Sequence, residues 1–284
     1  MKRGLILEGG GMRGMYTSGI LDVMMEHGLT VDGLVGVSAG AAFGCNFKSR
    51  QPGRALRYNE RFAHDRRYAG VWSLLTTGDY YNAEFCYHTV PTQYDPFDFE
   101  AFHSNPMEFY AACTDVDTGE AVYHLCGRDE DPHVTLEWIR ASASMPVVAQ
   151  PVKIDDRRLL DGGMSDSIPL RWFQSQGYDR NVVILTREDG YVKTPERLLP
   201  LIKWWMRKYP RVVEAMEGRS AFYNEQVQYV REQEQAGRVL VFRPDGPLNV
   251  SRTTHNPDDM RRVYALGREQ GLQRLQALQE FLQG

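Results

Sequence analysis

The pentapeptide Gly36–Gly40, with the sequence GVSAG, constrains the fold more than any other stretch of this 284-residue chain. It overlaps the end of a short apolar run, Gly33–Val37, and leads into a stretch of small residues, Ala39–Gly44. This order predicts a strand, a sharp turn at Ser38 and a helix. Such a turn holds a serine in a strained, exposed position at the end of a sheet, ready to attack a carbonyl group. The flanking Gly36 and Gly40 are expected because a Cβ would clash in so tight a bend.

Glycine is also concentrated near the amino terminus. The apolar run Leu5–Leu7 predicts a first strand, and the segment Gly9–Gly14 that follows it contains four glycines. Apolar residues at helical spacing then predict a helix over Met15–His27, and Leu34–Val37 is the second predicted strand. An order of strand, helix, strand and helix is typical of a parallel sheet with crossover helices.

The rest of the chain predicts a three-layer α/β/α sandwich with a mostly parallel central sheet. Residues 50–105 are expected to form helices and loops over one end of the sheet. Further strands are predicted at Glu108–Thr114, Ala121–Leu125, Val152–Ile154, Arg158–Leu160, Asn181–Leu185 and Arg238–Phe242. Helices are predicted at Leu136–Ser144, within Pro195–Gly237, and as one closing amphipathic helix at Met260–Gln283. No repeat or flexible linker interrupts the chain, which favours one compact domain.

Three segments carry groups that acyl transfer requires, namely a nucleophile, a base and donors for the oxyanion. Ser38 supplies a nucleophile. The loop Gly9–Gly14 can present bare backbone N–H groups to a developing negative charge, and Arg13 can fix the loop or add positive charge. Asp161 is expected at a strand end before Gly162 and Gly163, in a tight turn that could bring it close to Ser38.

The order GGGxRG, then GxSxG, then DGG resembles the patatin-like phospholipase family. The segment Ala141–Pro146 (ASASMP) resembles that family's helix ahead of its aspartate strand. The resemblance covers roughly residues 3–172, which would be the catalytic core, with residues 173–284 completing the same compact domain. Two positions depart from the common pattern: Glu8 stands where many members have aspartate, and Gly163 where many have alanine.

The resemblance implies a lipid acyl hydrolase with a Ser–Asp dyad and no cofactor. Ser38 would be the nucleophile, Asp161 the base, and lipid esters such as phospholipids or acylglycerols the substrates. The expected oxyanion hole and its support are Gly9, Gly10, Gly11, Arg13, Gly14 and Ala39. The expected elbow and turn glycines are Gly36, Gly40, Gly162 and Gly163.

Other interpretations of the motifs are weaker. The glycine loop also fits GxGxxG, the signature of a dinucleotide site, but Asp32 precedes the second strand whereas a ribose-binding acid should follow it. A conventional triad could use His255, which the sequence places in an exposed loop. An acyltransferase of the malonyl type usually has histidine before the serine, where Val37 stands. A non-catalytic lipid-binding protein of the same fold stays open as an alternative.

Composition limits partners and location. A net charge of −4 gives no reason to expect nucleic acid as a partner. Four cysteines without paired spacing, a short amino-terminal apolar run and no long apolar run predict a cytoplasmic protein. No histidine has the spacing of a metal ligand, so no metal site is predicted. The segment Leu201–Tyr209 mixes tryptophans with cations: it could rest peripherally on a membrane, but a helix that buries its tryptophans against the sheet is favoured.

Overall fold

The computed structural model describes residues 1–196 and 199–283, and eight strands form one sheet at its centre. The strand order is β5-β6-β3-β2-β1-β7-β8, with β4 also paired to β3. The strands are β1 (Arg3–Leu7), β2 (Gly33–Val37), β3 (Glu108–Asp115), β4 (Ala121–Leu125), β5 (Val152–Ile154), β6 (Arg157–Asp161), β7 (Arg180–Ile184) and β8 (Val239–Phe242). All strand predictions are therefore confirmed to within about two residues at each end.

The centre of the sheet is parallel and one side is antiparallel. Strands β1, β2, β3, β7 and β8 run in one direction, as crossover helices require. Strands β4 and β6 both pair antiparallel with β3, and β5 forms a hairpin with β6. The predicted mostly parallel sheet is confirmed.

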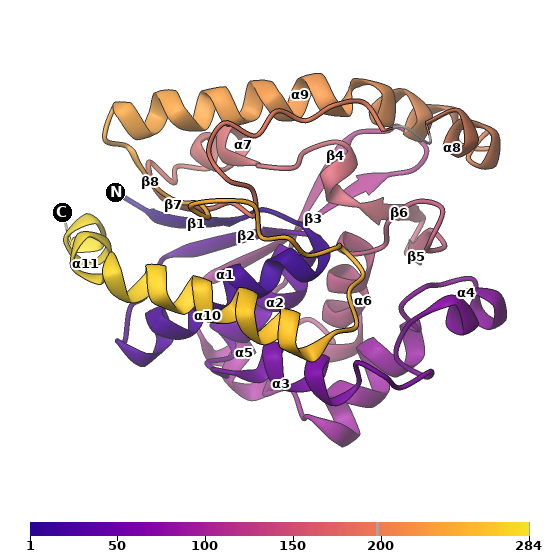
Figure 1. Ribbon diagram of the computed structural model, residues 1–284, viewed down its shortest axis with the longest axis horizontal. Coiled ribbons are helices and arrows are strands. Elements are labelled where there is room, and N and C mark those ends of the chain that lie inside the picture. Colours follow the sequence, from indigo (N-terminus) through magenta and orange to yellow (C-terminus); the bar gives the residue numbers. More distant parts are fainter. Residues whose placement is uncertain (197–198, 284) are drawn as a thin grey trace.

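Helices cover both faces of the sheet and produce three layers (Figure 1). One face carries α7 (Leu170–Ser175) and the long α9 (Pro210–Gln235), with the short α8 (Leu199–Trp205) at its end. The opposite face carries α1 (Gly14–Glu26), α2 (Ala39–Lys48), α3 (Arg54–Arg61), α5 (Phe99–Ser104), α6 (Pro132–Ser142) and α10 (Pro257–Gln273). The remaining elements are α4 (Val71–Thr77), a π-helix at Phe85–Tyr94, and short 3-10 turns at Gly11–Arg13 and Gly162–Met164.

Alternation along the strands divides the core between these two layers. Leu5 and Leu7 are fully buried against the α1, α2 and α10 side, whereas Ile6 between them is fully buried with α7 and α9 residues. Successive side chains of a strand point to opposite faces. Because both faces are covered, the central strands β1 and β2 are buried continuously rather than at alternate positions.

The end of the chain differs from the prediction. The single helix expected at Met260–Gln283 is two helices, α10 and α11 (Leu275–Gln283), separated at Arg274. Arg274 leaves helical geometry with φ −106° and ψ 12°, and its guanidinium donates to the carbonyl of Val241 on β8. The turn lets α11 bury Leu278 and Leu282 in the core.

The favoured interpretation of Leu201–Tyr209 is wrong. Trp204 and Trp205 on α8 do not pack against the sheet, because each is 60% exposed. The helical prediction for Pro195–Gly237 is confirmed by α8 and α9 where the structure describes it; Arg197 and Leu198 lie outside the described residues. Among the described residues, no helix is both long and apolar enough to cross a membrane.

Candidate active site

Ser38 occupies the sharp turn that the sequence predicts. It lies directly after β2 and caps α2, with φ 57° and ψ −124°. A non-glycine residue in such a conformation costs about 1–3 kcal/mol, which the surrounding structure must hold. A Cβ on Gly40 would collide with the carbonyl of Leu7, and one on Gly36 would lie 2.5 Å from the backbone nitrogen of Ala41. Glycine at both positions therefore permits the turn.

A serine on α6 holds this turn in place through two hydrogen bonds. The Ser38 N–H donates to the Ser142 hydroxyl at 3.0 Å, and that hydroxyl donates to the carbonyl of Ala112 at 2.6 Å. Ala112 lies on β3 opposite Val37 in the parallel register. Ser142 is fully buried, so the bond is shielded from water.

The sheet register brings Asp161 to the same edge as Ser38. Asp161 ends β6 and pairs with Cys113, one residue beyond the position that faces Val37. Its carboxylate accepts from the N–H of Gly163 at 2.8 Å, and its own N–H donates to the carbonyl of Ser144 at 2.8 Å. Backbone contacts therefore hold Asp161 in place on both sides.

Burial sets the protonation behaviour of Asp161. Only 5% of the residue is exposed, and desolvation raises the pKa of its carboxyl above the ordinary aspartate value. The nearby Ser38 side chain, the charge of Arg219 and the Gly163 N–H act in the opposite direction without cancelling the rise. A carboxylate with a raised pKa is a better proton acceptor than a free one.

The glycine loop lies beside Ser38 with unused donors. Gly9 approaches so closely that a Cβ there would lie 2.6 Å from the Cβ of Ser38, and Gly11 adopts φ 56°. In residues 1–196 and 199–283, no hydrogen bond uses the N–H groups of Gly10, Gly11 or Ala39. These groups are available to an oxyanion.

Arg13 is buried behind this loop and forms no ion pair with an acid of the described residues. It is 8% exposed, and its Nε has no hydrogen-bond partner among the described residues. Burial first, and then the nearby charge of Arg187, lower the pKa of the Arg13 guanidinium to about 10.

Of the other predicted glycines, Gly14 packs against Phe43, and a Cβ on Gly162 would collide with the carbonyl of Ala112.

Ser38, Asp161 and the glycine loop share one cavity of about 350 Å³, called here the polar cavity. Its other charged and polar lining residues are Glu8, Ser167, Arg187, Lys193, Glu196, Arg219, Tyr223, Arg252 and Thr253. Glu8, which replaces the more common aspartate, accepts from the Tyr223 hydroxyl at 2.8 Å and from the Thr186 hydroxyl at 3.1 Å. The acid therefore ties the end of β1 to α9.

A second hollow of about 100 Å³, called here the apolar pocket, opens on the other side of Ser38. Gly11, Ser38 and Met145 line both spaces. The other apolar lining residues include Ala42, Phe43, Tyr58, Tyr81, Tyr87, Val90, Pro91, Phe97, Leu136 and Ile139. Ser38 thus lies at the junction of a charged space and a hydrophobic one.

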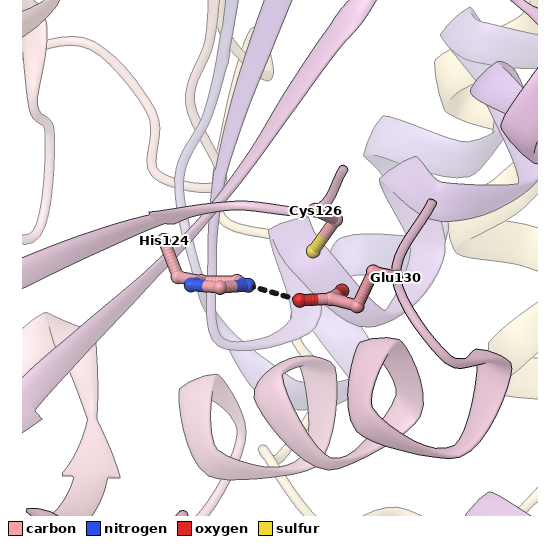
Figure 2. A group of neighbouring side chains, drawn as sticks. All are labelled: His124, Cys126 and Glu130. Carbon is pink, nitrogen blue, oxygen red and sulfur yellow. Dashed lines mark hydrogen bonds and ion pairs between the residues drawn. The ribbon is translucent and has the colours of Figure 1, made fainter. Parts of the chain in front are cut away.

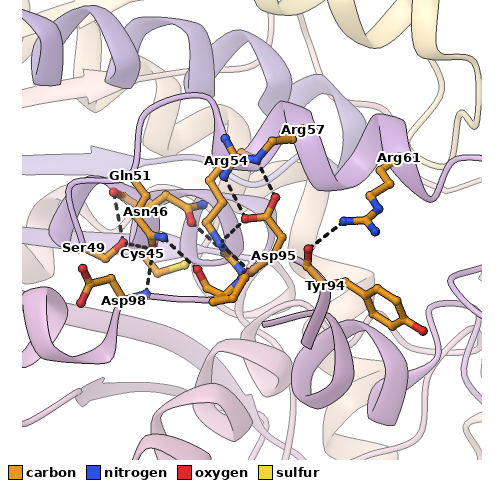
Figure 3. A network of polar contacts seen from close by, with 12 residues as sticks. Cys45, Asn46, Ser49, Gln51, Arg54, Arg57, Arg61, Tyr94, Asp95 and Asp98 are labelled. Carbon is orange, nitrogen blue, oxygen red and sulfur yellow. Dashed lines mark hydrogen bonds and ion pairs between the residues drawn. The ribbon is translucent and has the colours of Figure 1, made fainter. Parts of the chain in front are cut away.

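A buried ion pair stabilises one wall of the apolar pocket (Figure 3). Arg54 of α3 is 5% exposed and donates to the carbonyl of Asp95 at 2.7 Å and to the Asn46 side chain at 2.9 Å. The Asp95 carboxylate also accepts from Arg57 at 2.7 and 2.9 Å. Asp95 and Asn46 accept the hydrogen bonds of the Arg54 guanidinium. Arg54 can therefore lie beside the rings of Phe97 and Tyr58 without an unpaired charge.

The residues of the rival interpretations lie elsewhere. Asp32 precedes β2 and binds Arg3 at the opposite edge of the sheet, away from the glycine loop. His255 lies in a loop as predicted, but it is partly buried rather than exposed and its ring bonds the Tyr80 hydroxyl at 2.8 Å. No histidine is among the residues that line the polar cavity in the described part of the chain.

A cluster with metal-ligand chemistry lies outside the cavity, at the end of β4 (Figure 2). Ligand atoms of His124, Cys126 and Glu130 all lie within 4.8 Å of one another. Glu130 already accepts from Thr135 at 2.6 Å and bonds the His124 ring at 2.6 Å, and that ring stacks on Trp138. These contacts describe a hydrogen-bonded cluster that joins β4 to α6. The prediction that the protein holds no metal is not tested by it.

Sequence reasoning missed the basic residues of the carboxyl-terminal part. Arg219 on α9 donates to the carbonyl of Gly163, and a Cβ at Gly163 would lie 3.3 Å from its guanidinium. A side chain at position 163 would therefore crowd the Arg219 guanidinium, whereas glycine does not. The departure at Gly163 is the only signal in the sequence that another group approaches the turn.

A strained serine after a parallel strand, beside a glycine loop and a buried carboxylate, places the chain among α/β proteins with a nucleophile elbow. The family model for patatin-like phospholipase matches residues 5–173. The chain therefore belongs to the patatin-like phospholipase family and is a lipid acyl hydrolase. A second model, a domain of unknown function (DUF6363), matches residues 209–283.

Two relatives show how far the similarity extends. YjjU of Escherichia coli (strain K12), an uncharacterized protein, is 27% identical over 280 residues, which cover 93% of this chain and 74% of YjjU. Lysophospholipase NTE1 of Chaetomium globosum is 28% identical over 181 residues, which cover 62% of this chain and only 11% of NTE1. Among solved structures, VipD from Legionella pneumophila has a TM-score of 0.49 and 14% identity, covering 97% of this chain and 67% of VipD.

Proposed function

We propose that the protein hydrolyses carboxylic esters of lipids through a Ser38–Asp161 dyad and an acyl-enzyme. One observation supports this most strongly: Ser38 lies where a polar cavity that also holds Asp161 meets an apolar pocket. An ester bound at Ser38 would extend its acyl chain into the apolar pocket and its alcohol part into the polar cavity. The similarity to a protein named lysophospholipase is consistent with such a substrate.

The proposed reaction has two halves. Asp161 takes the proton of the Ser38 hydroxyl as its oxygen attacks the ester carbon, and the oxyanion is bound by the N–H groups of Gly10, Gly11 and Ala39. The tetrahedral intermediate collapses, the carbon–oxygen bond to the alcohol breaks, and the alcohol leaves with the proton from Asp161. Water then attacks the acyl-enzyme with Asp161 again as base, which releases the fatty acid and restores Ser38.

Labelling with a fluorophosphonate tests this proposal directly. We expect wild-type protein to be labelled at Ser38 and Ser38→Ala to be unlabelled, while Ser167→Ala remains labelled. Ser167 is a matched control, because it lines the same cavity and its hydroxyl is committed to the carbonyl of Gly163 at 2.9 Å. Folded wild-type protein that is not labelled, or is labelled elsewhere, would contradict the proposed nucleophile.

We further propose that α8 rests on a membrane surface during catalysis. Trp204 and Trp205 are exposed on this helix, and Ile202 of the same helix lines the polar cavity. Tryptophan is favoured at membrane interfaces because it combines a large apolar ring with a polar N–H. A cytoplasmic protein that acts peripherally at the membrane stays the prediction for its location.

The domain boundaries belong to the same proposal. Residues 3–172 would form the catalytic core and residues 173–284 would complete one compact domain with it. In support, β7 and β8 extend the same sheet as β1, and α10 packs closely on α1. The helices approach so tightly that a Cβ on Gly19 or on Gly267 would collide with the backbone of the partner helix.

A further inference from the structure

Four basic side chains converge on the polar cavity from beyond the family match, which ends at residue 173. They come from the segment after β7, from α9 and from the segment between β8 and α10. These residues, called here the basic wall, are Arg187, Lys193, Arg219 and Arg252. Arg13 on the glycine loop adds a fifth positive charge to the same lining.

Carboxylates do not balance these charges. Among the described residues, Glu8, Asp161 and Glu196 are the acids that line the cavity, three against five basic groups. Glu8 is committed to Thr186 and Tyr223, and Asp161 is the proposed base. Glu196 forms ion pairs with Arg252 at 3.5 Å and with Arg219 at 3.9 Å, so one carboxylate is shared between two guanidinium groups. Positive charge is therefore in excess where an ester's alcohol part would lie.

Lys193 is the clearest example of a positive charge in the polar cavity that no carboxylate balances. In residues 1–196 and 199–283, its ammonium has no carboxylate within ion-pair distance, and it lies over the Tyr223 ring at 4.6 Å. Burial first, then the charges of Arg219 and Arg252, lower the pKa of Lys193 to about 7, although Glu8 and Glu196 act against this. A cation held in such surroundings gains from an anionic ligand, because the ligand supplies the missing counter-charge.

We propose that the basic wall is a phosphate subsite that binds the phosphodiester of a lipid headgroup while the acyl chain occupies the apolar pocket. The inference rests on the proposed function, since it places the scissile ester at Ser38 between the two spaces. Guanidinium groups match phosphate oxygens with paired hydrogen bonds, and lysine binds phosphate as a point charge. A neutral acylglycerol would instead place an uncharged glycerol among five basic groups.

A pair of substrates with the same acyl chain tests the headgroup source. One is 1-palmitoyl lysophosphatidylglycerol, whose phosphodiester keeps a single charge throughout the neutral range, and the other is 1-palmitoylglycerol. We expect Lys193→Gln and Arg252→Gln to lower kcat/KM for the phospholipid by about tenfold each, the usual effect of losing one charge-assisted hydrogen bond. Hydrolysis of 1-palmitoylglycerol should stay within about twofold of wild type. Arg171→Gln is the matched control, because Arg171 is exposed and pairs with Glu225 away from the cavity.

Inorganic phosphate distinguishes a headgroup site from a site for free phosphate. Its binding is measured by calorimetry on Ser38→Ala protein, which needs no turnover, and then on the same protein with Lys193→Gln. Weaker phosphate binding in the double variant, together with the loss of phospholipid preference, supports the proposal. Weaker phosphate binding with an unchanged preference between the two substrates overturns the headgroup assignment in favour of free phosphate. Unchanged binding and preference overturn the subsite altogether.

The two proposals fail in different ways. If the proposed hydrolase function is wrong, wild-type protein turns over neither substrate, whatever its affinity for phosphate. If only the subsite is wrong, both esters are hydrolysed and the basic-wall variants treat them as wild type does. Circular dichroism on each variant confirms that a loss is not a loss of fold.

Discussion

The hydroxyl of Ser142 accepts a hydrogen bond from the backbone N–H of Ser38 at 3.0 Å and donates a second one to a backbone carbonyl of β3. The strained conformation of the proposed nucleophile therefore depends on a residue 104 positions away in the sequence. This link joins α6 to the turn between β2 and α2. It explains why a small hydroxyl residue fits at a fully buried position of α6.

Replacing Ser142 with alanine should loosen the turn. The buried N–H of Ser38 would lose its acceptor, which costs about 1–3 kcal/mol of stability. We expect kcat to fall by about tenfold, because Ser38 would no longer be held in its reactive conformation. Chemical denaturation and ester hydrolysis measure the two effects. Ser144→Ala is the control, since the Ser144 hydroxyl bonds only the carbonyl of Arg140 and its backbone contact to Asp161 would persist; equal losses in both variants would contradict this role of Ser142.

Asp161→Asn should separate activity from stability. We expect kcat to fall by about 10²–10⁴-fold, the usual contribution of a general base. Because burial raises the pKa of Asp161, the protonated form stabilises the fold, and this stabilisation is lost as pH rises through the raised value. At neutral pH the variant should therefore melt no lower than wild type, and the difference should shrink toward acid pH. Wild-type rates in the variant would rule out the dyad.

The pH–rate profile of the wild type should show an acid limb. Activity requires ionised Asp161, so kcat/KM should fall as pH decreases through an inflection above the ordinary aspartate value of 3.8. A short-chain p-nitrophenyl ester serves as the substrate, because it does not titrate in this range. A rate that stays flat down to pH 3.8 would show that Asp161 is not the base.

Filling the apolar pocket should change the preferred acyl length. Ala42 on α2 lines this pocket, and Ala42→Phe would place a ring where the proposed acyl chain lies. We expect the ratio of rates on C16 and C4 esters to fall by about tenfold or more, since roughly two or more methylene groups would lose their burial. Ala42→Ser nearly preserves the volume and should retain the wild-type ratio. An unchanged ratio in Ala42→Phe would place the chain elsewhere.

Removing the exposed tryptophans should weaken membrane association. We expect the double variant Trp204→Ser and Trp205→Ser to bind liposomes at least about tenfold more weakly, because two large apolar side chains no longer enter the interface. Co-sedimentation measures the effect. The control is Leu272→Ser on α10, which removes an apolar side chain that is 49% exposed. Equal binding by wild type and double variant would remove α8 from the membrane contact.

Local patterns predicted most of the fold. Apolar runs with turn residues at their ends located the strands, and the order of the three motifs correctly placed Ser38, Asp161 and the glycine loop around one cavity. The division at Arg274 was not predictable, because neither glycine nor proline marks it and its cause is a contact with Val241 on a distant strand.

The remaining parts of the site depend on long-range contacts. Arg219 and Lys193 resemble ordinary surface cations in the sequence. The docking of α9 across the sheet brings Arg219 to the cavity, and the path of the segment after β7 brings Lys193 there. Trp204 and Trp205 show the opposite error, since tryptophan usually packs inside and here does not. In both cases the residues of a segment were known, but the part of the fold that each side of the segment would face was not.

The end of the family match at residue 173 has an evolutionary consequence. The proposed chemistry lies before it, whereas the basic wall of the cavity is supplied by residues 187–252. A descendant could therefore acquire a new headgroup preference by exchanging its carboxyl-terminal half, with the reacting groups left untouched. Substrate choice and bond cleavage would then evolve as separately inherited traits. The hydrogen bond from Arg219 to the carbonyl of Gly163 is one contact that such an exchange would have to preserve.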